Sequence, residues 1–131
     1  MSTILTHLKY TPSHEWVECE TDQIVRVGIT DHAQALLGDI VFVELPTLNR
    51  TVAQKEEIAV LESVKAAADV YAPVSGEIIE VNTQLEQAPE SINQEAYHQG
   101  WLVRIQLSDP SQLESLLSPA EYQQQMTVEA E

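Results

Sequence analysis

The chain has 131 residues, of which 21 are acidic and six are basic, so its formal net charge is −15 at pH 7. Its hydrophobic fraction of 44% is enough to build a buried core, which argues against a disordered acidic chain. Nucleic acids and anionic membrane surfaces are disfavoured as partners, because both need a basic footprint on the protein. The single cysteine, Cys19, excludes an intramolecular disulfide.

Two further exclusions concern where the protein resides. No apolar run approaches the ~20 residues that a membrane-spanning helix needs. The segment Met1–Tyr10 lacks the basic and apolar regions of a signal peptide. We therefore expect a soluble protein that forms a single domain over residues 1–131. A bacterial cytoplasm is the favoured location, although a processed organellar protein would have the same features.

The first half of the chain is predicted to contain short strands and one helix. β-branched residues favour the strands, and Thr21-Asp22 suits a hairpin turn between the first two. Asp31 and Gln34 have capping-box spacing for a helix that ends at Gly38. The predicted strands are His14–Glu20, Gln23–Ile29 and Ile40–Leu45, and a polar surface loop follows over Leu48–Glu57.

A hairpin is predicted in the middle of the chain. The runs Ile58–Val64 and Ala67–Tyr71 form two strands joined by a tight turn, so the hairpin covers residues 58–71. Pro73 and Gly76 mark a second turn. The remaining predicted strands are Glu77–Val81 and Trp101–Leu107.

The connections of the second half are predicted to be loops and short helices. Asn82–Gln99 has few strand formers and is expected to be a long surface loop. Asp109 and Ser118 each precede a proline, which predicts two short helices within residues 109–125. The glutamine-rich end, Gln123–Glu131, is expected to fray. The pattern as a whole is typical of a mostly β sandwich or flattened barrel with peripheral helices.

The sequence offers little for self-contained catalysis. The four histidines lack the spacing of metal ligands, and neither a nucleophile elbow nor a phosphate-binding glycine loop is present. Cys19 lies between Glu18 and Glu20, whose negative field disfavours the reactive thiolate.

Lys65 is one of only three lysines, and it stands at the predicted apex of the hairpin. Its neighbours are small, and no other basic residue lies within nine positions of it. Such a position presents the ε-amine to a modifying enzyme. From geometry alone, a solubilising turn lysine and a Schiff-base lysine remain open. Schiff-base chemistry needs an amine with a lowered pKa, whereas the nearby Glu62 favours the charged form.

The sequence around this lysine resembles a known family. Glu62-Ser63-Val64-Lys65-Ala66, followed by Ala72-Pro73-Val74-Ser75-Gly76-Glu77, is similar to the lipoylation hairpin of glycine cleavage system H proteins. Ala96 departs from the family's usual proline, and Leu48-Asn49-Arg50 stands where a glycine is common. Other similar blocks, in the same order, are Tyr10–Val17, Val27–Gln34, Gly38–Pro46, Pro89–Asn93, Gly100–Leu102, Leu113–Leu117 and Glu121-Tyr122.

The resemblance implies a fold, a cofactor and a set of partners. The fold would be the lipoyl/biotinyl-type flattened β-barrel, a sandwiched hybrid motif, with short peripheral helices that include a C-terminal pair. Lipoic acid would be attached covalently to Lys65 and flanked by Glu62, Ser63, Val64 and Ala66. The protein would be a monomeric, non-catalytic carrier in glycine catabolism.

The implied carrier serves three enzymes in turn. It would take the aminomethyl group of glycine from the pyridoxal-phosphate-dependent glycine decarboxylase to the tetrahydrofolate-dependent aminomethyltransferase. It would then present its dithiol to dihydrolipoamide dehydrogenase. A lipoate-attaching enzyme is the fourth implied partner. The cofactor would bring its own two sulfurs, so a chain with one cysteine can still take part in redox chemistry.

The resemblance also implies a cleft that protects the loaded arm. Its residues map to Ser13, Glu15 and Asp69, and a carboxylate-lined cleft would hold the ammonium group by charge-assisted hydrogen bonds. Solvated surface acids are the plainer interpretation of Glu15 and Asp69. Trp16 and His32 are expected to be core or edge residues.

Four other classes of protein compete with a lipoyl carrier of glycine cleavage. Biotinyl sites have methionines beside the lysine, whereas Val64 and Ala66 flank it here. Lipoyl domains of 2-oxoacid dehydrogenases have Asp-Lys-Ala at the turn and sit on long linkers. An acidic adaptor that has lost its cofactor and a Schiff-base enzyme acting through Lys65 are the other two candidates.

Overall fold

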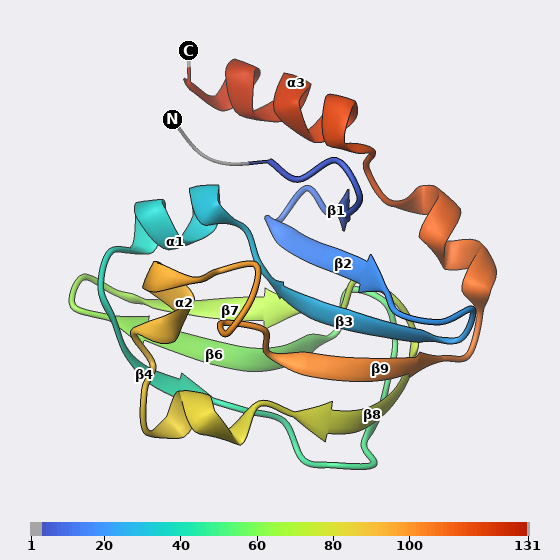
Figure 1. The fold of residues 1–131 in the computed structure, drawn as a ribbon, viewed down its shortest axis with the longest axis horizontal. Helices are drawn as coiled ribbons and strands as arrows, with labels where there is room; N and C mark the ends of the chain where they lie inside the picture. The colour runs from blue at the N-terminus through green and yellow to red at the C-terminus, as the bar shows by residue number, and fades with distance from the viewer. Residues whose placement is uncertain (1–3, 131) are drawn as a thin grey trace.

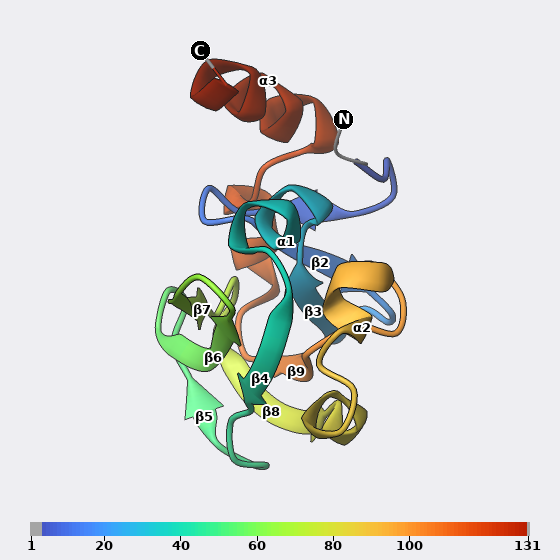
Figure 2. The ribbon, with the colours of Figure 1, turned by 90° about the vertical axis from the view of Figure 1, so that its left-hand side faces the viewer.

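The computed structural model describes residues 4–130, with side chains described through residue 127. Two antiparallel sheets form a flattened sandwich, which confirms the predicted fold class (Figures 1 and 2). The larger sheet has six strands in the order β1-β2-β3-β9-β8-β5, and the smaller has the order β4-β6-β7. Among the described residues, no helix is long and apolar enough to cross a membrane.

The elements follow one another along the chain as short strands interrupted by short helices. The strands are β1 (Lys9–Tyr10), β2 (Glu15–Cys19), β3 (Ile24–Ile29), β4 (Ile40–Glu44), β5 (Thr51–Val52), β6 (Glu57–Ser63), β7 (Ala67–Tyr71), β8 (Gly76–Val81) and β9 (Val103–Leu107). The α-helices are α1 (Asp31–Leu37), α2 (Ser91–Gln94) and α3 (Pro119–Ala130), and the 3₁₀ helices are η1 (Thr83–Glu86) and η2 (Pro110–Ser115).

The main core lies between the two sheets. Val25 and Val27 of β3 and Ile105 of β9 are fully buried, because alternate side chains of these strands point inward. Leu61 of β6 joins the same cluster from the smaller sheet. Each such aliphatic side chain contributes about 1.5–3 kcal/mol on burial, so this contact holds the sheets together.

A second, aromatic core fixes the C-terminal helix to the larger sheet. The rings of Tyr10 on β1 and Tyr122 on α3 are stacked, with centroids 4.6 Å apart. The Tyr122 hydroxyl lies 2.7 Å from both His14 Nδ1 and Thr30 Oγ1. Trp16 of β2 is buried in the same cluster, as expected for a core residue. Helix α3 lies along one side of the sandwich in both views (Figures 1 and 2).

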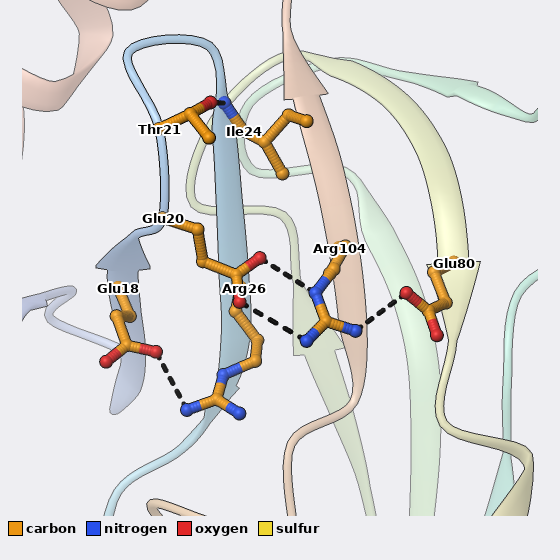
Figure 3. Close-up of polar contacts among 7 residues, drawn as sticks. All are labelled: Glu18, Glu20, Thr21, Ile24, Arg26, Glu80 and Arg104. Carbon is orange, nitrogen blue, oxygen red and sulfur yellow. Dashed lines mark hydrogen bonds and ion pairs between the residues drawn. The ribbon is translucent and has the colours of Figure 1, made fainter.

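The outer face of the larger sheet carries an array of ion pairs (Figure 3). Arg26 and Arg104 are direct partners in the β3–β9 register, which would be unfavourable without compensating charge. Arg26 pairs with Glu18 at 2.7 Å, and Arg104 lies between Glu20 and Glu80, at 2.7 Å from each. The third arginine, Arg50, pairs with Glu56 elsewhere on the surface. All three arginines are therefore already paired with carboxylates.

The predicted loops contain more regular structure than expected. Thr51–Val52 forms β5 inside the predicted Leu48–Glu57 loop, because Val52 is buried and pairs with Gly76. The predicted loop Asn82–Gln99 contains η1 and α2, which bury Leu85 and Ile92. β1 was not predicted either, since a two-residue strand carries no periodic signal.

The helix ends also differ from the prediction. Thr30 rather than Asp31 caps α1, since its hydroxyl accepts a bond from the Ala33 amide at 3.2 Å. The prediction that Gln123–Glu131 frays was wrong for the described part, because α3 continues to Ala130. Buried Tyr122 and Met126 hold this helix against the aromatic core. Glu131 lies outside the described residues.

Two sequence departures are accommodated without loss of structure. Asn49 adopts a left-handed backbone with φ of 68°, a conformation that asparagine tolerates better than most residues other than glycine. The Ala96 carbonyl accepts a 3.0 Å hydrogen bond from Trp16 Nε1, which fixes this loop without a proline.

Docking of α3 can be tested at Tyr122. Tyr122→Ala removes a fully buried ring and should lower the free energy of unfolding by about 3–5 kcal/mol. Tyr122→Phe keeps the ring stacked on Tyr10 and removes only the hydroxyl contacts, so about 1–2 kcal/mol should be lost. Equilibrium urea denaturation measures both, and equal losses would contradict the stacking contribution.

Candidate functional site

Lys65 lies at the apex of the β6–β7 hairpin, where the patterning predicts a turn. The Ser63 amide donates to the Ala66 carbonyl at 2.8 Å, which closes the turn. The Ser63 hydroxyl oxygen also accepts hydrogen bonds from the amides of Lys65 (3.2 Å) and Ala66 (3.1 Å). The serine side chain thus satisfies the backbone donors that an exposed four-residue turn would leave open.

The side chain of Lys65 is exposed and extends over Gly38. A Cβ built on Gly38 would lie 3.3 Å from Lys65 Cε, so the missing side chain leaves room for the lysine. Gly38 also has a φ of 82° at the end of α1, which favours glycine. Among the residues the structure describes, none forms a hydrogen bond or ion pair with Lys65 Nζ. The amine is therefore available for chemistry.

The turn is tied to the junction between α1 and β4. The Val64 amide donates to the Asp39 carbonyl at 3.0 Å. Asn93 of α2 secures that junction from the other side: its Nδ2 donates to the Gly38 carbonyl and its Oδ1 accepts from the Ile40 amide, both at 2.8 Å. The lysine therefore projects from a braced support, at the edge where the β6–β7 connection and α1 lie together (Figure 1).

Glu15 is a buried carboxylate at the start of β2. Only 2% of the residue is exposed. The hydroxyls of Thr11 and Ser13 each donate to Oε1 at 2.5 Å, and the Tyr71 amide donates to Oε2 at 3.3 Å. Burial raises the pKa of Glu15, and the hydroxyl and amide donors partly oppose that rise. Within the described part of the chain, Glu15 has no ion-pair partner.

Glu15 lines a cleft of about 610 Å³ that is formed by segments distant in sequence. Ser13 lines it too, so the structure brings two of the three predicted cleft residues together. Asp69 does not line it; this exposed acid lies on β7 two residues before Tyr71, on the same face of the strand. The further lining residues are Thr11, Pro12, Gln54, Lys55, Tyr71, Ala72, Pro73, Ser115 and Leu116.

Sequence reasoning missed several of these lining residues. Thr11 had a local signal, because it precedes Glu15 by four residues within a turn-forming segment. Lys55 has a left-handed φ of 75°, which nothing in its sequence context indicated. Ser115 at the end of η2 and Leu116 just after it reach the cleft about a hundred residues after Ser13, through tertiary packing alone.

The lysine and the cleft lie towards opposite ends of β7. β7 alone, from Ala67 to Tyr71, spans about 13 Å at about 3.3 Å per residue, and Lys65 lies beyond its Ala67 end. That distance exceeds the reach of a lysine side chain. A group that extends the lysine would be needed to connect the two sites.

The other histidine, cysteine and acidic side chains that the structure describes form no metal-binding cluster. No group of three or more metal-ligating side chains occurs within residues 4–127. Cys19 is exposed, and the rings of His14 and His32 lie 4.8 Å apart beside the aromatic core. The hairpin and the cleft are therefore the features that call for a functional explanation.

Comparisons with known proteins agree over nearly the whole chain. A family model described as glycine cleavage H-protein matches residues 8–129. The chain is 57% identical to the glycine cleavage system H protein of Pseudoalteromonas translucida, over 93% of this chain and 95% of that protein. It is 55% identical to the one of Thiobacillus denitrificans, over 98% of each chain. The crystal structure of a glycine cleavage system H protein from Mycobacterium marinum has a TM-score of 0.87 and 39% identity, and the match covers 95% of this chain and 99% of that one.

The pH dependence of stability tests the environment of Glu15. Because burial raises the pKa of its carboxyl above the ordinary value of 4.5, the native state keeps this proton where the unfolded chain has lost it. The contribution of Glu15 to the free energy of unfolding therefore falls as the pH rises from 4.5 through the native pKa, and then levels off.

Urea denaturation of the wild type and Glu15→Gln across about pH 4 to 7 measures this effect. The stability of the variant relative to the wild type should increase with pH over that window. Asp22→Asn, which removes an exposed acid of the β2–β3 turn, is the matched control for the loss of one carboxyl. Parallel curves for the wild type and Glu15→Gln would contradict the raised pKa.

Proposed function

The chain belongs to the glycine cleavage H-protein family, and we propose that Lys65 is the residue on which it carries lipoate. Proteins of this family are lipoyl carriers of the glycine cleavage system and not catalysts. Their partners lie within that system. We assign the lipoate to Lys65 because its amine is accessible at the apex of a hairpin that hydrogen bonds hold in place.

The residues at the turn fit a covalent lipoyl attachment. An amide link requires an accessible primary amine, and Lys65 offers one on a narrow turn with Ala66 beside it. The other lysines fit less well: Lys9 is half-buried in the short strand β1, and Lys55 lies in a left-handed backbone conformation beside Glu56. When attached, lipoate supplies a disulfide that can be reduced and reoxidised.

The proposed role is to carry the aminomethyl group of glycine between enzymes. The carrier takes this group from glycine decarboxylase to the aminomethyltransferase. Dihydrolipoamide dehydrogenase then reoxidises the carrier. A separate enzyme attaches the lipoate. We further propose that residues 1–131 act as one monomeric carrier domain in the bacterial cytoplasm. The bacterial sources of the similar proteins support this location.

The cleft is proposed to shelter the loaded arm from water. Glu15 is a buried carboxyl without an ion-pair partner among the described residues, and its ionised form would attract an ammonium group. Ser13 holds this carboxylate in place through its hydroxyl. Asp69, exposed on the same strand face as Tyr71, adds negative charge between the turn and the cleft.

The attachment residue is tested by mass measurement. Wild-type protein incubated with lipoate, ATP and a lipoate ligase should gain one lipoyl group, and Lys65→Arg should gain none because a guanidinium does not form this amide. Lys55→Arg is the matched control and should be modified as fully as the wild type. Intact-mass spectrometry reads all three. An unmodified wild type, or a lipoylated Lys65→Arg protein, would refute the assignment.

The protective cleft is tested by the lifetime of the loaded carrier. Glu15→Gln combined with Asp69→Asn should leave lipoylation intact and shorten the lifetime of the aminomethyl-loaded form, since the charges facing the ammonium are removed. The two single variants separate the contribution of the buried acid from that of the exposed one. Asp22→Asn serves as the control, and the loss of the aminomethyl group is followed by mass. A hydrolysis rate equal to that of the wild type would remove both acids from this role.

A further inference from the structure

The edge strand β4 contains an irregularity close to the lysine. Its register against β6 shifts between Ile40 and Phe42, so the normal alternation of buried and exposed side chains is broken. Val41 and Phe42 are consecutive and both exposed, at 55% and 51%. Phe42 is also the only phenylalanine of the chain. A bulge that turns two apolar side chains outward leaves apolar surface in water. Because this exposure does not stabilise the fold, it indicates a role in binding.

These side chains belong to an apolar collar around the lysine, which we define as Leu36, Val41, Phe42 and Val64. Leu36 and Val64 are the most exposed of the four, at 60% and 68%. Leu36 lies two residues before Gly38, which the Lys65 side chain crosses. Phe42 is the direct β-sheet partner of Glu62, three residues before Lys65. Four of the six large hydrophobic side chains that are exposed among the described residues therefore lie on the Lys65 turn or on the α1 and β4 segments next to it.

Acidic side chains surround this collar. Asp39, Glu44, Glu62 and Asp69 are all exposed on the segments that carry it or pair with them. A second copy of the chain is a poor occupant, because two molecules of net charge −15 repel each other. The complementary partner has an apolar centre and a basic rim.

We propose that the collar is the docking surface for the enzyme that acylates Lys65, a proposal that rests on the lipoyl attachment proposed above. This enzyme must bring its own active site to Nζ, so it necessarily covers the residues around the turn. Enzymes that act on the far end of an attached arm have no such requirement.

The reaction at this surface is an acyl transfer. Lys65 Nζ loses a proton to a base of the enzyme and attacks the carbonyl carbon of an acyl adenylate. A C–N bond forms, the C–O bond of the mixed anhydride breaks, and AMP leaves with the bonding pair. The collar takes no part in these bonds; it positions the carrier so that Nζ meets the carbonyl carbon.

The test compares two serine substitutions of similarly exposed side chains. Phe42→Ser removes the one aromatic side chain of the collar, and Leu48→Ser removes a residue of nearly equal exposure (50%) in the β4–β5 connection near β8. With lipoate, ATP and a lipoate ligase, kcat/KM should fall about tenfold or more for Phe42→Ser, mainly through KM. Leu48→Ser should match the wild type. Leu36→Ser is a second collar variant on another element, and a fall there supports the proposal independently of the folding of Phe42→Ser.

A chemical probe separates docking from exposure of the amine. Acetylation of Lys65 by a small N-hydroxysuccinimide ester needs no docking, so its rate should be equal in all variants. If Phe42→Ser and Leu36→Ser are lipoylated as fast as the wild type, the docking surface is refuted while the lipoyl attachment stands. If chemical acetylation slows in parallel with lipoylation, docking is likewise refuted. A wild type that gains no lipoyl group refutes the attachment itself, and the docking proposal with it.

Discussion

The antiparallel register of β6 and β7 is the constraint on which the functional surface depends. The pairing of Glu62 with Ala67 places Lys65 at the apex, and the pairing of Val60 with Asp69 leaves Val70 facing the core. At the far end of β7, the same register brings the Tyr71 amide to the carboxylate of Glu15. A slip by one residue would turn Val70 outward and separate Tyr71 from Glu15. A single strand pairing therefore positions both the amine and the acid of the cleft.

Whether a carboxylate is paired with an arginine or with neutral donors decides whether it can still bind a cationic ligand. The carboxylates on the outer sheet face are paired with Arg26 and Arg104, so they stabilise the fold and attract little else. Glu15 is stabilised differently, by neutral hydroxyl and amide donors. Such donors offset part of the desolvation cost while leaving the negative charge uncompensated. The chain thus keeps a buried carboxyl whose ionised form a cationic group entering the cleft would complement.

The sequence predicted those parts of the fold that have strong local signals. The β6–β7 hairpin follows from two apolar runs with a short break, and α1 follows from its cap-like start and Gly38. β1 and β5 were not predicted, because a two-residue strand shows no alternation of apolar and polar residues. The burial of Tyr10 and Val52 in the folded chain decides how these strands pair. Ser13 and Glu15 could be named from a short block of sequence. Ser115 and Leu116 could not, because only the packing of η2 brings them to the cleft.

Around Lys65, some residues stabilise the fold, whereas others are exposed at a cost in stability and suit the binding of a partner. Ser63, Asn93 and the Val64–Asp39 hydrogen bond all stiffen the support of the turn, which is a structural task. The β4 bulge does the opposite, since it exposes Val41 and Phe42 where regular alternation would have exposed only one of them. Burying an aliphatic or aromatic side chain is worth about 1.5–3 kcal/mol, so this exposure forgoes stability. A turn closed by several hydrogen bonds, with exposed apolar side chains on the neighbouring segments and an amine that none of the described residues binds, is preorganised for a partner, because less of it has to be ordered on binding.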